Sequence, residues 1–256
     1  MWKSVRIAVL LLVLAAVALH AWLDRVATQS WQEPLWVGLF PLNADGSASA
    51  QEYAAALGVK DFAAIEDFFT REGRRYGLKL EQPVHVELYP PGSKLPPSLD
   101  PSAGPLGMAW WSLKLRYFAS QASAVPGRAP PRIRLFLLYH DPATLEVAPD
   151  SHGLQKGLVG VVHLFADPGM AGSNSIVIAH ELLHTVGASD KYDLGSGSPL
   201  FPSGYGNREQ DPLYPQERAE VMAGRRALSS YQWDMPRTLA GVLIGPETAR
   251  EIRWTH

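Results

Sequence analysis

The chain has 256 residues, of which 46% are hydrophobic and 19% charged, a balance typical of a globular protein with a packed core. Its 23 lysines and arginines nearly balance 25 aspartates and glutamates, and the formal charge of −2 argues against a role in nucleic-acid binding. Cysteine is absent, which excludes disulfides, thiolate metal sites and cysteine nucleophiles. Any metal must therefore be held by His, Asp or Glu.

The first predicted element is a membrane segment. Residues 7–23 read IAVLLLVLAAVALHAWL and follow Lys3 and Arg6. Basic residues ahead of an apolar run predict that the N-terminus stays in the cytoplasm while the rest of the chain crosses. We therefore predict a single-pass signal anchor and connector over residues 1–29, with the lipid bilayer as a partner of residues 7–23 and the folded domain outside the cytoplasm. Cleavage of this segment, followed by secretion, is the alternative.

Strands and helices alternate through the remainder of the chain. In chain order, we predict a strand at 35–42, helices at 47–57 and 60–76, a strand at 84–89, a helix at 108–122, strands at 132–139 and 158–165, and helices at 175–186 and 246–254. A long loop rich in Gly, Pro and Ser covers 194–215. This order predicts an α+β fold with a mixed twisted sheet in one domain, 30–256, divided into an upper subdomain at 30–187 and a loop-rich lower subdomain at 188–256.

The predicted helix at 175–186, capped by Asn174 or Ser175, carries the sequence His180-Glu181-Leu182-Leu183-His184. Histidines four residues apart project from one face of a helix, and this spacing lets two imidazoles bind one zinc ion. Glu181 follows the first histidine and lies where its carboxylate can reach a water on the metal. The helix therefore predicts a catalytic zinc site.

A third metal ligand is expected just beyond this helix. Gly187 can adopt the left-handed conformation that ends a helix and reverses the chain, which would bring Asp190 back toward the two histidines. Asp193 takes this role if the turn is longer, and Glu217 and Glu220 are further alternatives.

Residues 180–190 resemble the metzincin clan of zinc metallopeptidases, whose signature is HExxHxxGxx followed by His or Asp. The Asp form is like that of the snapalysin group, and Asp-Lys-Tyr-Asp at 190–193 is similar to the sequence after the zinc helix of immune-inhibitor-A-type peptidases. This resemblance implies a zincin fold, with His180, His184 and Asp190 as zinc ligands and Glu181 as the catalytic base.

Metzincins also place a methionine turn beneath the metal, and the resemblance assigns this role to Met222 in Glu-Val-Met-Ala-Gly at 220–224. Astacins and serralysins have a tyrosine two residues past that methionine, whereas this chain has Gly224. A tyrosine that stabilises an oxyanion would have to come from elsewhere in the chain. The candidates are Tyr192, Tyr205, Tyr214 and Tyr231.

Together these features predict a membrane-anchored zinc metalloprotease that acts on a peptide or protein substrate. The strand at 158–165 is expected to be the edge strand that binds an extended substrate. Acidic residues 190, 193 and 211 form a candidate structural calcium site. One alternative is a catalytically inactive zincin-fold binding or assembly factor at the membrane, although such a protein has no need of Glu181. Another is a zinc hydrolase of non-peptide amides.

Overall fold

The computed structural model describes residues 28–100, 102–149, 151–154 and 158–255, together with residues 2, 5–7, 11, 12, 19 and 26. The larger elements are β1 (Leu35–Asn43), α2 (Ala48–Ala56), α3 (Ala63–Arg75), β2 (Val84–Leu88), α4 (Pro105–Ala122), β3 (Ile133–His140), β4 (His152–Leu154), β5 (Val159–Phe165), α5 (Ala171–Thr185) and α6 (Pro246–Glu251). The smaller elements are short 3₁₀ turns and two-residue strands. The turns are η1 (Val59–Phe62), η2 (Pro168–Met170) and η3 (Leu239–Gly241), and the strands are β6 (Ala219–Glu220), β7 (Arg226–Ala227), β8 (Trp233–Asp234) and β9 (Val242–Leu243).

The central sheet has the strand order β2-β1-β3-β5-β4. The strands β2, β1, β3 and β5 are parallel, and β4 pairs antiparallel with β5 at the end of the sheet. Parallel strands are usually covered on both faces, and β1 and β3 are accordingly apolar along most of their length. The expected combination of helices with a mixed sheet is therefore confirmed.

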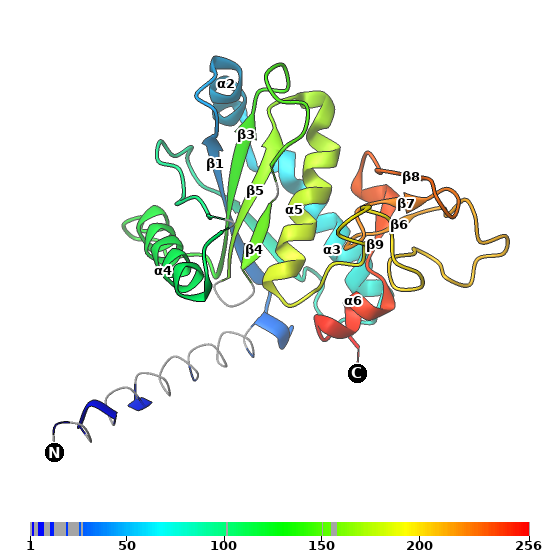
Figure 1. Cartoon of the computed structure of the whole chain (residues 1–256), viewed down its shortest axis with the longest axis horizontal. Helices are drawn as coiled ribbons and strands as arrows, with labels where there is room; N and C mark the ends of the chain where they lie inside the picture. Colours follow the sequence, from blue (N-terminus) through cyan, green and yellow to red (C-terminus); the bar gives the residue numbers. More distant parts are fainter. Residues whose placement is uncertain are drawn as a thin grey trace.

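Helices cover both faces of this sheet (Figure 1). Side chains of a strand alternate between its faces. Val37 and Leu39 accordingly lie in the core formed with α2, α3 and α5, whereas Phe40 and Phe136 pack beneath α4. The zinc-motif helix α5 thus lies against the sheet on the same side as α3, which gives its backbone a fixed support.

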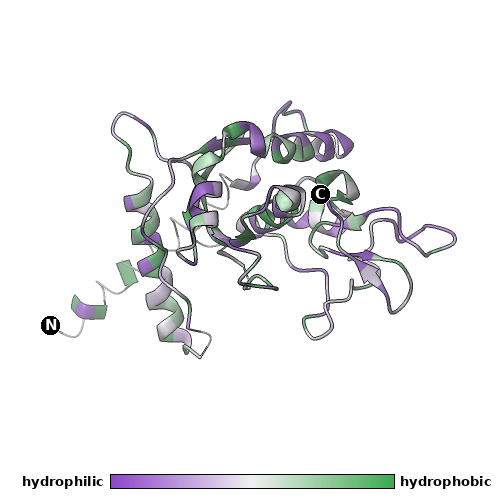
Figure 2. Cartoon of the chain, turned by 90° about the horizontal axis from the view of Figure 1, so that it is seen from above, coloured by the Kyte–Doolittle hydropathy of each residue, from purple (hydrophilic) through white to green (hydrophobic). Residues whose placement is uncertain are grey.

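Residues 188–255, within the predicted lower subdomain, are rich in loops and lie beside α5 and α3 (Figure 1). Their backbone pairing consists of β6 with β9 and β7 with β8. Figure 2 shows that many of these loops are hydrophilic, in contrast to the apolar sheet region. Helix α6 is the last element of this region. Trp31, at the start of the domain, donates a hydrogen bond from Nε1 to the Ile252 carbonyl at the end of this helix over 2.7 Å.

Two local expectations need correction. The strand at 158–165 is an edge strand only in part, because β4 pairs with Val159–Val161 on the side away from β3, and no strand of the described residues pairs with 162–165 on that side. The zinc-motif helix begins at Ala171, ahead of the expected cap, because the preceding turn η2 already starts the helical path at Asp167. Asn174 does not cap the helix: its side chain donates to the Phe165 carbonyl over 2.8 Å and accepts from the Phe165 amide over 3.3 Å.

The prediction of a single-pass membrane protein is also corrected. Among the residues that the structure describes, no helix combines the length and the apolar character needed to cross a bilayer. The segment expected to do so, residues 7–23, lies mostly outside the described residues.

Candidate metal centre

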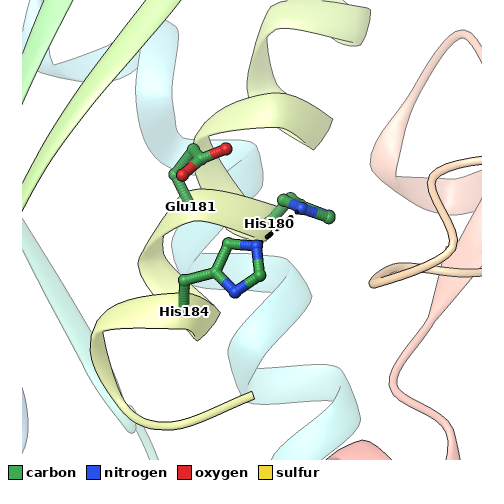
Figure 3. Close-up of side chains that lie close together, drawn as sticks. All are labelled: His180, Glu181 and His184. Atoms are coloured by element: carbon green, nitrogen blue, oxygen red, sulfur yellow. Dashed lines mark hydrogen bonds between the residues drawn. The ribbon is translucent and has the colours of Figure 1, made fainter. Parts of the chain in front are cut away.

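Two histidines of α5 face each other on one side of the helix, as the four-residue spacing predicts (Figure 3). Their Nε2 atoms are 3.0 Å apart. The side chains of His180 and His184 are 14% and 19% exposed, so both keep some contact with solvent. A catalytic metal needs an open position for water and substrate.

The turn after α5 brings a carboxylate to the same point. Gly187, with φ of 109°, ends the helix in a Schellman motif, in which the Ala188 amide donates to the Leu183 carbonyl over 3.0 Å. The chain then reverses, and Asp190 Oδ1 lies 3.2 Å from His180 Nε2 and 3.1 Å from His184 Nε2. The three atoms expected to hold zinc are therefore close together.

The remaining ring nitrogens show which tautomer each histidine adopts. His180 Nδ1 lies 3.1 Å from the Val221 carbonyl, and His184 Nδ1 lies 2.9 Å from the Ala188 carbonyl. A carbonyl can only accept, so each Nδ1 carries a proton, and in the neutral form of each ring Nε2 presents a lone pair. Metal-bound histidines are usually oriented in this way by a backbone carbonyl or a carboxylate.

When both imidazoles are neutral, three electron-rich atoms therefore converge on one point. Asp190 Oδ1 is buried and accepts no hydrogen bond of normal geometry. Zinc ligands with bonds of about 2.0–2.1 Å in a tetrahedral arrangement are roughly 3.3 Å apart. The separations of 3.0–3.2 Å between these three atoms are close to that value. The residues present therefore fit a zinc ion.

Electrostatics at this point favour a positive charge. Burial by itself raises the pKa of Asp190, but the two adjacent imidazoles, His180 and His184, hold this pKa well below its usual range. Burial lowers the pKa of His184, yet the neighbouring carboxylates of Asp190 and Glu181 raise it overall. Asp190 is therefore ionised at neutral pH, and a cation beside it is stabilised.

Glu181 occupies a different position from the third ligand. It is 4% exposed, and its carboxylate lies within 4.8 Å of the ligand atoms of both histidines. Asp190 Oδ1 lies within 3.2 Å of both Nε2 atoms, so it is the better candidate for the third ligand. Glu181 lies near enough to reach a water held beside the two histidines.

The alternative acidic ligands lie elsewhere. Asp193 is exposed and accepts hydrogen bonds from the amide and hydroxyl of Ser196, each over 2.8 Å. Glu217 is exposed, and Glu220 is fully buried with its carboxylate turned to backbone amides. No group of Asp190, Asp193 and Asp211 within metal-ligand distance is found in the part of the chain that the structure describes.

Met222 lies at the centre of a buried turn below the histidines. It is 0% exposed, and its carbonyl accepts from the Lys191 amide over 3.0 Å. The preceding carbonyl, of Val221, is the one that orients His180. The Met222 carbonyl therefore contacts the loop that carries Asp190, whereas the contact with α5 is made by the carbonyl of Val221.

The candidate tyrosines take different positions. Tyr205 and Tyr214 share a hydrogen bond of 2.8 Å between their hydroxyls, and Tyr231 is 74% exposed. Burial, followed by this hydrogen bond, raises the pKa of Tyr205 to about 12. Tyr205 is therefore protonated at neutral pH, and its hydroxyl is committed to Tyr214. Tyr192 forms an isolated bridge with Pro199.

Sequence reasoning missed the roles of two residues around the site. Lys191 is buried beside Asp190 and pairs with Glu251, and Glu220, which was expected only as an alternative ligand, supports the Met222 turn. Their only sequence signal is their place next to Asp190 and Met222. Comparison of the chain with protein-family models and with curated proteins gives no match.

Proposed function

We propose that this protein is a zinc-dependent peptidase of the zincin type. The observation that carries this proposal is the convergence of His180 Nε2, His184 Nε2 and Asp190 Oδ1 within 3.2 Å of one another. The resemblance of residues 180–190 to the metzincin signature supports the same ligand set. When bound at these atoms, zinc acidifies a water molecule and polarises a carbonyl group.

Glu181 is the proposed general base and general acid. Its buried carboxylate lies beside the ligand atoms without being the nearest oxygen to them. It would accept the proton of the attacking water and then deliver that proton to the leaving amine. The carbonyls of Val221 and Ala188 orient the two imidazoles by accepting their Nδ1 protons, which leaves Nε2 as the metal-binding nitrogen of each neutral ring.

An extended peptide is the proposed substrate. The short strand β4 lies at the end of the sheet, antiparallel to β5, and α5 packs beside this region. An edge strand can bind an extended chain through backbone hydrogen bonds. Such binding depends little on side chains, so the loop at 194–215 is the proposed source of specificity.

The deciding experiment is Glu181→Gln in the full chain. This change keeps the size of the side chain and removes the proton-accepting charge. We expect the variant to keep its zinc, its fold and its peptide binding, while turnover falls by roughly two to four orders of magnitude. Zinc content, peptide binding and cleavage are measured on one preparation, with the exposed Glu209→Gln as the matched control.

Two results would contradict the proposal. One is that the wild-type protein cleaves nothing in a broad peptide library. The protein is then an inactive binding factor or, if it cleaves non-peptide amides, an amide hydrolase. The other is that Glu181→Gln cleaves as fast as the wild type, in which case another residue is the base.

A further inference from the structure

Glu220 is a buried carboxylate that the proposed hydrolysis does not use. It is 0% exposed, and each of its oxygens accepts two hydrogen bonds. Oε1 accepts from the Gly245 amide over 3.1 Å and from the Thr248 hydroxyl over 2.7 Å, both at the start of α6. Oε2 accepts from the amides of Met222, over 2.6 Å, and Ala223, over 3.0 Å. A carboxylate can be buried at acceptable cost only when it is satisfied in this way.

The first of these amides belongs to a peptide group that also contacts a proposed zinc ligand. The peptide between residues 221 and 222 donates its N–H to Glu220 Oε2, and its carbonyl, that of Val221, accepts from His180 Nδ1 over 3.1 Å. The carboxylate and the imidazole are therefore connected through one peptide group. A hydrogen bond at the N–H of a peptide strengthens the acceptor at its carbonyl.

The second amide belongs to the next peptide group, which contacts the ligand loop. The peptide between residues 222 and 223 donates to the same Oε2 atom, and its carbonyl accepts from the Lys191 amide over 3.0 Å. Lys191 directly follows Asp190. Glu220 Oε2 therefore fixes two carbonyls. That of Val221 holds the ring of His180, and that of Met222 holds the backbone beside Asp190.

We infer that Glu220 is a positioning residue of the proposed zinc site, which sets the orientation of His180 and Asp190 through two consecutive peptide groups. This inference rests on the proposed function. His184 is oriented separately, because its Nδ1 atom donates to the Ala188 carbonyl in the turn that ends α5. His184 can therefore be compared with His180 and Asp190 in the same protein, because the orientation of His180 and Asp190 depends on Glu220 and that of His184 does not.

Glu220→Gln in the full chain tests this inference. The amide nitrogen of Gln cannot accept, so the variant loses either the hydrogen bonds from the Met222 and Ala223 amides or those from the Gly245 amide and the Thr248 hydroxyl. We expect zinc affinity, measured by competition with a chelator, to fall roughly tenfold or more, as for other residues that orient metal ligands. In metal-free protein, the ¹⁵N and ¹H signals of the His180 ring should move more than those of His184, whose Nδ1 contact with Ala188 is independent of Glu220. Glu209→Gln is the control with an unchanged affinity.

Equal zinc affinity in a folded Glu220→Gln variant would overturn the inference, and so would equal shifts of the two imidazoles, which indicate general loosening. If the variant does not fold, the wild type provides the test. Loading with zinc should move the amide signals of Met222 and Ala223 more than that of Gly245, and unchanged Met222 and Ala223 signals would overturn the inference. If the wild type binds no zinc, the proposed function fails, whereas the His180 signals of metal-free Glu220→Gln still test the positioning role.

Discussion

Lys191 Nζ lies 2.9 Å from one carboxylate oxygen of Glu251 and 2.8 Å from the other. The side chain of Lys191 is 6% exposed. Lys191 directly follows Asp190 in the sequence, whereas Glu251 is the last residue of α6. The same ammonium group donates to the Ser189 carbonyl over 2.9 Å. The loop that presents Asp190 is thus attached to the last helix of the domain.

Lys191→Met should destabilise the protein because it leaves Glu251 without its counter-charge. Removing one member of a buried pair costs about 3–5 kcal/mol, and the partial exposure of Glu251 reduces the expected loss to about 2 kcal/mol. Urea unfolding measures this free energy. Arg208→Met is the control, because it breaks the more exposed Arg208–Glu247 pair and should cost less than about 1 kcal/mol. Equal costs for the two variants would contradict the structural role of Lys191.

The Lys191–Glu251 pair also predicts how stability depends on pH. Burial alone raises the pKa of Glu251, but the hydrogen bonds from Lys191 and Ser189 lower it overall from its ordinary value of 4.5. A lowered carboxyl pKa contributes stability that is present above the unfolded pKa and is lost as the pH falls through the folded pKa. Glu251→Gln should therefore be less stable than the wild type at pH 7, and the difference should shrink below about pH 4.5. Thermal unfolding across this range tests it.

The ligand set gives a graded prediction for zinc content. His180→Ala and His184→Ala should lose zinc, and Asp190→Ala should lose most of it, because each removes one of three converging atoms. Asp193→Ala should keep full zinc, because its carboxylate bonds only within its own turn. Metal analysis of the purified variants decides between them, and loss of zinc from Asp193→Ala with retention in Asp190→Ala would mean that the third ligand is wrong.

Zinc occupancy should also depend on pH. The ring nitrogens must be unprotonated to bind metal. Since the pKa of His184 is raised above its ordinary value of 6.5, a proton competes with zinc already in mild acid. Occupancy should fall as the pH drops below neutrality and return on neutralisation, as measured by dialysis and metal analysis. Full occupancy down to about pH 4 would argue against a histidine site.

Met222 should tolerate a change of shape better than a loss of volume. It is 0% exposed, so Met222→Ala leaves a cavity and should cost about 2–5 kcal/mol of unfolding free energy. Met222→Leu conserves most of the volume and should cost less than about 1.5 kcal/mol. Both variants keep the backbone carbonyls of the turn, so zinc affinity should change little in the leucine variant. A large loss of zinc in Met222→Leu would indicate that the sulfur itself matters.

Local patterns allowed much of the site to be predicted. The four-residue spacing of His180 and His184 defines their shared helix face, and the conformational freedom of Gly187 accounts for the return of the chain to Asp190. These contacts are short in sequence, so spacing alone constrains them. The main strands and helices were predicted for the same reason, within a few residues at their ends.

Contacts distant in sequence could not be predicted in this way. The hydrogen bonds of Glu220 to Gly245 and Thr248 and the pairing of Lys191 with Glu251 join segments whose separation leaves no periodic pattern. The start of β5 lies inside the sheet only because of β4, a strand of three residues that is too short for a hydrophobic pattern. The sequence pattern of an apolar strand is the same whether one or two neighbouring strands pair with it.

The attachment of α6 to both the Met222 turn and the Asp190 loop has a consequence for biosynthesis. The ribosome makes both histidines well before it makes Gly245, Thr248 and Glu251, which complete the hydrogen bonds of Glu220 and Lys191. A nascent chain that ends before α6 carries the zinc motif without the groups that hold its surroundings in place. Under the proposed function, hydrolytic capacity is thus delayed until nearly the whole domain has been synthesised, which protects the emerging chain from its own catalytic centre.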